Sequence, residues 1–234
     1  MSKFDPQAFF NRAKTLVTNT KETWVTIRGE ATSVKELYLS WILIGAAIPP
    51  VCQFIGTILF GIKIPLTGIT VRPGLFDALF SGLIAYGFSL VGTYILALIL
   101  SKLAPKFGGQ EDLVSTLKLV AYSMTPVWIA GILSLVGLSV LGIVQLVVSC
   151  YALYILYQGI TILTGVPEGR RNTYFGASIL CSMVVMFFVS LLTAAVSPRL
   201  PMPEIDYGNG TGRFDSDKFE EGMKQLQNLI PKNN

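Results

Sequence analysis

Long uncharged runs dominate the pattern of apolar and polar residues along this chain. The longest extends from Leu119 to Pro167 and contains no Asp, Glu, Lys or Arg. A helix crosses a hydrocarbon layer of ~30 Å with about 20 residues, so this run is long enough for two crossings and a turn. The expected turn lies at Val136 to Ser139, which includes a glycine. The run therefore predicts a helical hairpin within a membrane.

Three further uncharged runs predict three more crossings. They extend from Leu37 to Ile62, from Ala78 to Ser101 and from Asn172 to Pro198, with charged residues between them. The second helix of the hairpin is expected from about Leu141 to Leu163. The predicted fold class is therefore all-α, a polytopic membrane protein with five transmembrane helices.

The first 36 residues mix basic and acidic side chains and contain one amphipathic pattern. Its apolar members recur at helical spacing. They are Phe9, Phe10, Ala13, Leu16 and Val17. A helix with this stripe can lie flat on lipid headgroups, with Trp24 as an interfacial anchor further on, or pack on the protein itself. Both interpretations are open from the sequence.

The predicted domains are an N-terminal segment at 1–36, a transmembrane domain at 37–198 and a tail at 199–234. The tail has a second amphipathic pattern from Phe219 to Ile230. Basic residues concentrate in 1–36 and in the connections that would lie on the same side of the membrane. Because basic loops remain in the cytosol, the N-terminus is predicted to be cytosolic and the C-terminus extracytoplasmic.

Prolines interrupt two of the predicted crossings. Pro49 and Pro50 lie midway along the first crossing, and Pro126 lies in the third. A proline donates no backbone hydrogen bond and clashes with the preceding turn, so these positions predict helix kinks.

A polar face is predicted beside the third proline. Lys118, Tyr122 and Thr125 follow one another at helical spacing. The simpler interpretation is that Lys118 extends its amine to the membrane surface, as long basic side chains do. The alternative is that the face binds a solute.

A second polar stripe lies on the fourth crossing. Tyr151, Tyr154, Tyr157 and Gln158 occupy about a third of the helix circumference. Hydroxyl groups in lipid need partners, so the stripe is expected to face other helices or the interface. A tyrosine-lined solute path is the alternative.

The composition supports a membrane protein and gives little sign of catalysis. The chain is 52% hydrophobic and 14% charged, with a mean hydropathy of +0.59. It has no histidine, and its three cysteines lie in apolar runs, where we expect them to pack. They are Cys52, Cys150 and Cys181. No catalytic residue, metal site or cofactor is predicted, so the chain is not expected to be an enzyme.

The net charge of +4 favours association with anionic lipid headgroups and gives no reason to expect nucleic acid. The first function hypothesis is a non-enzymatic membrane scaffold or adaptor. Its partners would be membrane lipids and a membrane protein or a second copy of the chain. The alternative is a small-solute or ion channel or transporter that uses the proline-broken helices and the face of Lys118, Tyr122 and Thr125.

A series of short motifs extends from about Lys21 to Leu192. They are Lys21-Glu22-Thr23-Trp24 with Glu30, Phe107-Gly108-Gly109, Leu117 to Pro126 with Gly131, Tyr151, Tyr154, Leu156-Tyr157-Gln158-Gly159, Val166-Pro167 and Tyr174. In order and spacing they resemble the bacterial branch of the Yip1 domain family. The resemblance implies five transmembrane helices and a cytosolic N-terminus.

Two departures limit what the resemblance implies about function. Thr20 replaces the proline that often precedes the first motif, and the Asp-Leu-Tyr-Gly-Pro motif of eukaryotic members is absent. Rab-GTPase binding and Golgi trafficking are therefore not transferred. The implied location is the bacterial cytoplasmic (inner) membrane, with a eukaryotic endomembrane as the alternative.

Overall fold

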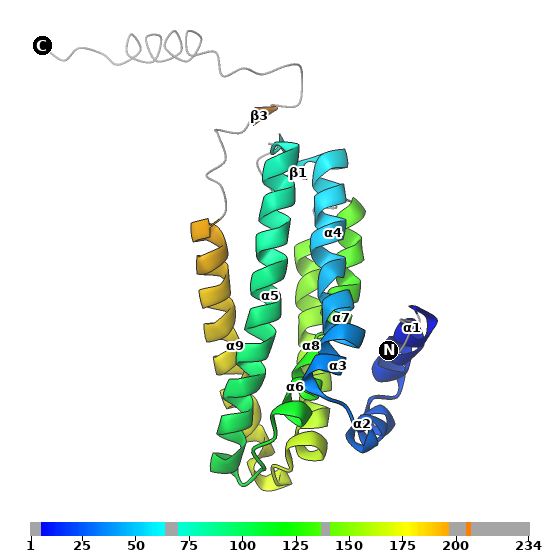
Figure 1. Cartoon of the computed structure of the whole chain (residues 1–234), viewed down its shortest axis with the longest axis vertical. Helices are drawn as coiled ribbons and strands as arrows, with labels where there is room; N and C mark the ends of the chain where they lie inside the picture. Colours follow the sequence, from blue (N-terminus) through cyan, green and yellow to red (C-terminus); the bar gives the residue numbers. More distant parts are fainter. Residues whose placement is uncertain (1–5, 64–69, 137–140, 197–204, 207–234) are drawn as a thin grey trace, which may run out of the picture.

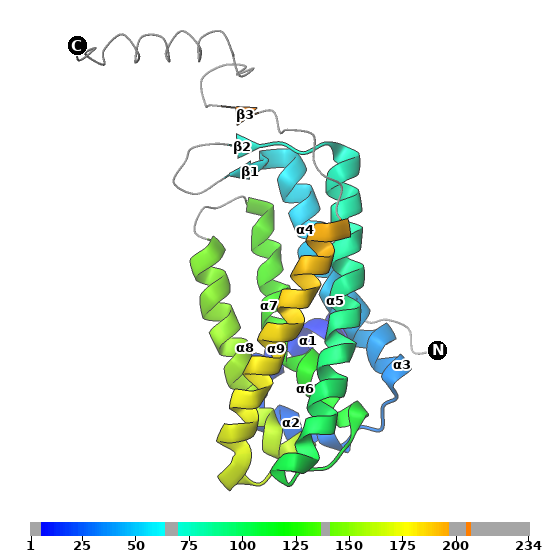
Figure 2. The same ribbon diagram turned by 90° about the vertical axis from the view of Figure 1, so that its left-hand side faces the viewer.

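The computed structural model describes residues 6–63, 70–136, 141–196 and 205–206 (Figures 1 and 2). The expected turn after Val136 and the expected tail helix lie outside these residues.

Helices form almost all of the described chain, and their bounds follow the apolar runs. They are α1 Pro6–Thr18, α2 Thr20–Gly29, α3 Val34–Leu37, the π-helix η1 Tyr38–Ile42, α4 Leu43–Phe60, α5 Leu75–Leu103, the 3-10 helix η2 Ala104–Phe107, α6 Leu113–Ser123, α7 Thr125–Ala130, the 3-10 helix η3 Gly131–Val136, α8 Leu141–Thr164 and α9 Glu168–Val196.

Within the described residues, five helical spans are long and apolar enough to cross a membrane. They are Val34–Phe60, Leu75–Phe107, Leu113–Leu135, Gly142–Thr164 and Glu168–Val196. The predicted fold class and the predicted number of spans are confirmed. The orientation of the two termini stays a prediction.

Three strands of two residues each lie at the end of the bundle where α4 ends and α5 begins (Figure 2). β1 (Ile62–Lys63) pairs antiparallel with β2 (Thr70–Val71), which pairs antiparallel with β3 (Ile205–Asp206). The sequence predicted only a loop after α4. Two residues are too short for a period-two pattern to be recognised.

The spans run lengthwise side by side, and α4 and α5 are neighbours (Figure 1). α4 also packs on α7 and η3, α5 packs on α6 and α9, and α8 packs on α6 and α7. α1 and α2 lie beside the half of the bundle where α5 ends and α6 begins (Figure 1). This arrangement brings α1 and α2 against the third and fourth spans.

The prolines have different consequences in the two spans. α4 continues through Pro49 and Pro50 as one helix, and the irregular turn is the π-helix that precedes it. In the third span, α6 ends at Ser123 and α7 begins at Thr125, so the interruption coincides with Pro126.

Glycines allow α4 to approach the third span closely. A Cβ placed on Gly45 would lie 2.1 Å from the Trp128 ring, and one on Gly131 would lie 2.8 Å from the Cα of Pro49. A Cβ on Gly56 would lie 2.2 Å from the Ser134 carbonyl oxygen. In lipid, small residues at such crossings stabilise helix pairs because the backbones can touch.

Gly56→Ala is expected to destabilise the bundle by about 1 to 2 kcal/mol, because the added methyl group meets backbone that cannot move aside. Gly87→Ala is the matched control, since a Cβ there meets nothing within 4 Å. Alanine is the better helix former, so the control should be neutral or slightly stabilised. Unfolding of both variants in detergent micelles would compare them, and an equal effect would contradict the close crossing.

Candidate functional site

The N-terminal helices are packed on the bundle by one set of apolar side chains. Phe9, Ala13 and Leu16 of α1 are buried, whereas Phe10 and Val17 are exposed. Of the two interpretations of this stripe, packing on the protein is therefore confirmed for three of its five members.

Trp24 anchors α2 on the fourth span. Its side chain is fully buried, and its Nε1 donates a hydrogen bond to the Ile155 carbonyl oxygen at 3.1 Å. The ring lies so close to α8 that a Cβ on Gly159 would be 2.7 Å from it. Of the two interpretations left open for this segment, Trp24 supports packing on the protein, because α8 supplies both the apolar surface and the acceptor that the indole needs.

Lys118 holds the end of the same helix. Its side chain is only 4% exposed, and its Nζ donates to the carbonyl oxygens of Ile27 at 3.0 Å and Glu30 at 2.5 Å. α2 ends at Gly29, so the ammonium group lies at the negative end of the helix dipole. The expectation that Lys118 reaches the membrane surface is therefore wrong, since α2 offers the amine carbonyl acceptors closer by.

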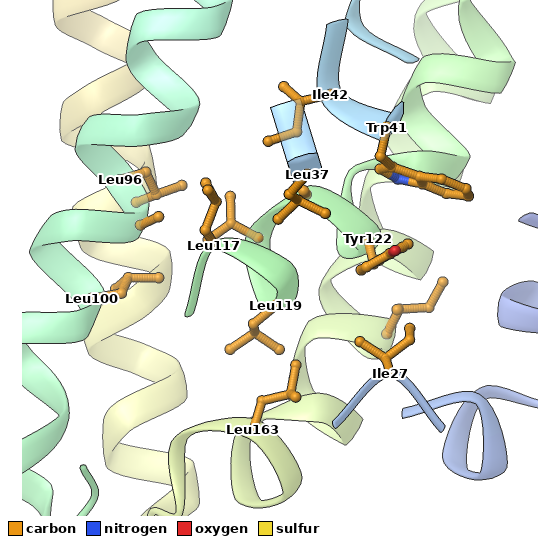
Figure 3. Close-up of a cluster of buried hydrophobic side chains, with 14 of the residues drawn as sticks. Ile27, Leu37, Trp41, Ile42, Leu96, Leu100, Leu117, Leu119, Tyr122 and Leu163 are labelled. Carbon is orange, nitrogen blue, oxygen red and sulfur yellow. The ribbon is translucent and has the colours of Figure 1, made fainter. Parts of the chain in front are cut away.

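An aromatic cluster joins α1, η1 and α6 around Tyr122. The Trp41 ring lies 4.7 Å from the Tyr122 ring and 4.3 Å from the Phe9 ring, measured between centroids. Figure 3 shows Trp41 and Tyr122 side by side, with Ile27 next to them. Tyr122 is therefore part of the packed interface that holds the N-terminal helices.

Arg12 adds a charged contact at the edge of this cluster. Its guanidinium group forms an ion pair with Glu30 and lies 5.5 Å from the centroid of the Tyr122 ring. Burial alone would lower the pKa of Arg12, but the hydrogen bond to Glu30 and the nearby Tyr122 raise it above its ordinary value. The guanidinium group stays charged at any physiological pH, and its ion pair with Glu30 ties α1 to the end of α2.

Thr125 completes the predicted polar face. It is fully buried, and its hydroxyl group lies 3.5 Å from the Ala121 carbonyl oxygen within its own span. Lys118, Tyr122 and Thr125 are thus all packed against protein, and the first two contact the N-terminal helices. We call Arg12, Trp24, Glu30, Lys118 and Tyr122 the docking cluster. The sequence singled out Trp24, Lys118 and Tyr122 but did not predict the contacts that join them to other parts of the chain.

The tyrosine stripe of α8 is divided between two neighbours. Tyr151 donates to the Val17 carbonyl oxygen at 2.5 Å, and Tyr157 donates to the Asn172 side chain at 2.8 Å. Tyr154 is half exposed and stacks on Tyr151. Contacts with α1 and α9 explain why hydroxyl groups are placed along this helix.

Gln158 belongs to a cavity of about 330 Å³ between α2, the end of α8 and the start of α9. The lining residues are Lys21, Glu22, Val25, Gln158, Thr161, Ile162, Glu168 and Arg171. The guanidinium group of Arg171 lies 4.2 Å from the centroid of the Tyr157 ring, which fixes its position. The sequence analysis did not predict this cavity. The available signal was the spacing of Gln158 and Thr161 on one helix and of Glu168 and Arg171 on the next.

The described residues contain no group of three His, Cys, Asp or Glu that could hold a metal ion. The three cysteines are free thiols. Cys52 and Cys181 are partly buried, whereas Cys150 is exposed on the surface of the bundle, so its expected packing role is wrong for this conformation of the chain.

Five apolar spans, packed through glycines and with two short helices docked beside one half of the bundle, define a multi-pass α-helical membrane protein. Residues 14–192 match the model of the Yip1 domain. The chain belongs to the Yip1 domain family. The match begins within α1 and therefore covers the docking cluster, apart from Arg12, as well as the spans.

Two curated relatives are each named inner membrane protein YohC. One is from Escherichia coli strain K12 and the other from Escherichia coli O6:H1. Each is 24% identical over 168 residues, which cover 71% of this chain and 86% of the relative. No solved structure matches the chain. The predicted location in the bacterial cytoplasmic (inner) membrane is confirmed by these relatives together with the five spans.

Proposed function

We propose that this Yip1 family protein is a non-enzymatic scaffold or adaptor of the inner membrane, in which the docked N-terminal helices form the binding surface for a partner. The observation that carries the proposal is the docking cluster. In this cluster a buried lysine, a buried tryptophan and an ion pair fix two short helices to the bundle. Such fixation gives α1 and α2 one orientation and lowers the entropic cost of binding.

The outer face of the docked helices supplies the contact surface. Phe10 on α1 and Val25 on α2 are 53% and 63% exposed, and Lys14 and Lys21 are exposed on the same two helices. Apolar and basic side chains together suit a surface close to lipid headgroups and an acidic or amphipathic segment of another membrane protein. The partner would be such a protein or a second copy of this chain.

The absence of a suitable acid and base pair supports a role without catalysis. Acid and base catalysis needs two groups within reach of one substrate, and the described spans contain no histidine. The carboxylates Glu22 and Glu168 line one cavity, but only Glu168 belongs to a span. The conduit alternative would need Lys118, Tyr122 and Thr125 to face a solute path. All three are buried against protein, which favours the scaffold over the conduit.

A photo-crosslinking amino acid at Phe10 should capture the same discrete partner in intact membranes as one at Lys14, because both are exposed on α1. The matched control is Leu180, which is 66% exposed on α9 and should capture no such partner. A Lys118→Met background should reduce the yield at both α1 positions, because it loosens the docked helices.

A flux assay with purified protein tests the conduit alternative. The purified chain in dye-loaded liposomes should conduct K⁺, Cl⁻ and H⁺ no faster than empty liposomes. Flux that Lys118→Ala abolishes, together with no crosslinked partner at either α1 position, would contradict the scaffold proposal.

A further inference from the structure

The cavity between α2, α8 and α9 has the lining of a small-ligand site. Each helix contributes one face, with Lys21, Glu22 and Val25 from α2, and Glu168 and Arg171 from α9. Its volume of about 330 Å³ falls within the ~300–1,000 Å³ of ordinary ligand pockets. Helix ends and helix faces thus converge on one space that no part of the described chain fills.

The charges around this cavity are not paired with one another. Lys21 and Arg171 are positive, Glu22 and Glu168 are negative, and the structure has no ion pair among these four side chains. The Nε of Arg171 is buried and has no hydrogen-bond partner. A ligand with a negative and a positive group could contact the cations and the carboxylates together through charge-assisted hydrogen bonds. The lining therefore suits a ligand that carries both signs of charge.

The cavity also lies where a lipid headgroup would be. It is at the end of the bundle where α8 ends and α9 begins, beside α2, which packs on α8 (Figure 2). Val25 and Ile162 give part of the lining an apolar character next to the charged groups. A glycerophospholipid likewise has a charged headgroup close to apolar acyl chains.

We propose that this cavity binds a phospholipid whose headgroup carries a phosphate and a primary ammonium group. Lys21 and Arg171 contact the phosphate, and the Gln158 amide and the Thr161 hydroxyl group add neutral hydrogen bonds. Glu22 and Glu168 accept hydrogen bonds from the ammonium group. The cavity shares Lys21 and Val25 with the surface proposed for the protein partner, whereas Phe10 and Lys14 of that surface do not line it. The lipid proposal is tested by lipid retention and the partner proposal by crosslinking from α1, so either can fail alone.

The acids give the site its selectivity. A primary ammonium group donates hydrogen bonds to carboxylates, whereas a quaternary ammonium group has no hydrogen to donate. A purely anionic headgroup would bring its phosphate to the two cations and leave both carboxylates without a positive partner. The order of affinity is therefore phosphatidylethanolamine above phosphatidylcholine and above phosphatidylglycerol.

Native mass spectrometry of the full chain tests this order. The chain is purified in detergent micelles with equimolar phosphatidylethanolamine, phosphatidylcholine and phosphatidylglycerol of identical acyl chains. Bound phosphatidylethanolamine is expected to exceed each of the other two about tenfold, because two charge-assisted contacts distinguish it. Equal retention of the three lipids, or a preference for phosphatidylglycerol, would overturn the proposal.

Variants locate the binding. Lys21→Gln lies on an exposed position of α2 and should weaken retention of phosphatidylethanolamine about fivefold, whereas Glu168→Gln should abolish the preference over phosphatidylcholine. The matched controls, Lys35→Gln and Glu111→Gln, remove exposed charges that do not line the cavity and should leave the ratios unchanged. Unchanged ratios in both cavity variants, with helix content preserved by circular dichroism, would contradict the site.

A soluble headgroup has the same charged chemistry as the lipid. Glycerophosphoethanolamine is therefore added at millimolar concentration in a separate measurement. If the lipid stays bound, the acyl chains contribute and the lipid assignment holds. If the soluble compound displaces the lipid completely, the lipid assignment is overturned.

Discussion

Trp24→Ala should release the N-terminal helices from the membrane-embedded bundle. The indole is fully buried against α8, and removal of a buried tryptophan costs about 4 kcal/mol in lost contacts and residual cavity. The Ile155 carbonyl oxygen also loses the donor that lies 3.1 Å from it. Hydrogen exchange of the amides in α1 and α2, measured in micelles, should accelerate by the factor that this loss of free energy implies for local opening. The amides of α5 should keep their protection.

Two substitutions on α2 separate the causes of this effect. Trp24→Phe keeps an aromatic ring but removes the Nε1 donor and part of the buried ring system, so it should cost about 2 kcal/mol, less than Trp24→Ala. Val25→Ala shortens the neighbouring side chain, which is 63% exposed, and should have almost no effect on exchange. Exchange in Trp24→Ala that matches exchange in Val25→Ala would show that α2 is held by something other than its tryptophan.

The spans could be predicted from the sequence because the signal for them is local. A run of uncharged residues must lie in lipid whatever it packs against, and its length alone decides how many crossings it makes. The run from Leu119 to Pro167 yielded two spans by this argument, and both are present. The short strands near Lys63 were not predicted, because strands of two residues are too short to show a periodic pattern in the sequence.

The docking cluster could not be predicted because its contacts join distant parts of the chain. Lys118 contacts a carbonyl oxygen 91 residues earlier, and Trp24 contacts one 131 residues later. From the sequence, each has an ordinary explanation at a membrane surface, where amines and indoles are both well solvated. Only the three-dimensional arrangement brings α2 into contact with both Lys118 of α6 and Ile155 of α8. The spacing of Lys118 and Tyr122 did indicate one shared face, and both contact the N-terminal helices.

The cavity at α8 and α9 was partly visible in the sequence. Gln158 was predicted as the end of a polar stripe, whereas Glu168 and Arg171 lie outside the uncharged runs that end at Pro167 and begin at Asn172. Since α9 begins at Glu168, these side chains lie on the first turn of a helix and face a fixed direction. When the first turn of a span carries charged side chains, it can therefore form a polar site together with the end of the preceding span.

Lys118→Met should loosen the end of α2 by about 2 to 3 kcal/mol, because hydrogen bonds from a charged donor are strong and the carbonyl acceptors stay behind. Methionine has a similar length and fills the same space, so packing changes little. It also avoids the cost of burying an ammonium group, and this gain offsets part of the loss. The net effect remains a loss, since the Glu30 carbonyl oxygen gives up a donor at 2.5 Å and the helix dipole gives up its compensating charge.

Hydrogen exchange resolves this effect by position. The amides at the C-terminal end of α2 should exchange faster in Lys118→Met, and the amides of α6 should change less, because the lysine backbone stays in its own helix. Lys102→Met is the matched control, since Lys102 is exposed in the last turn of α5 at the same end of the bundle. If both variants leave α2 equally protected, the ammonium group of Lys118 contributes nothing to docking and the helix is held by Trp24 and the apolar contacts of α1 alone.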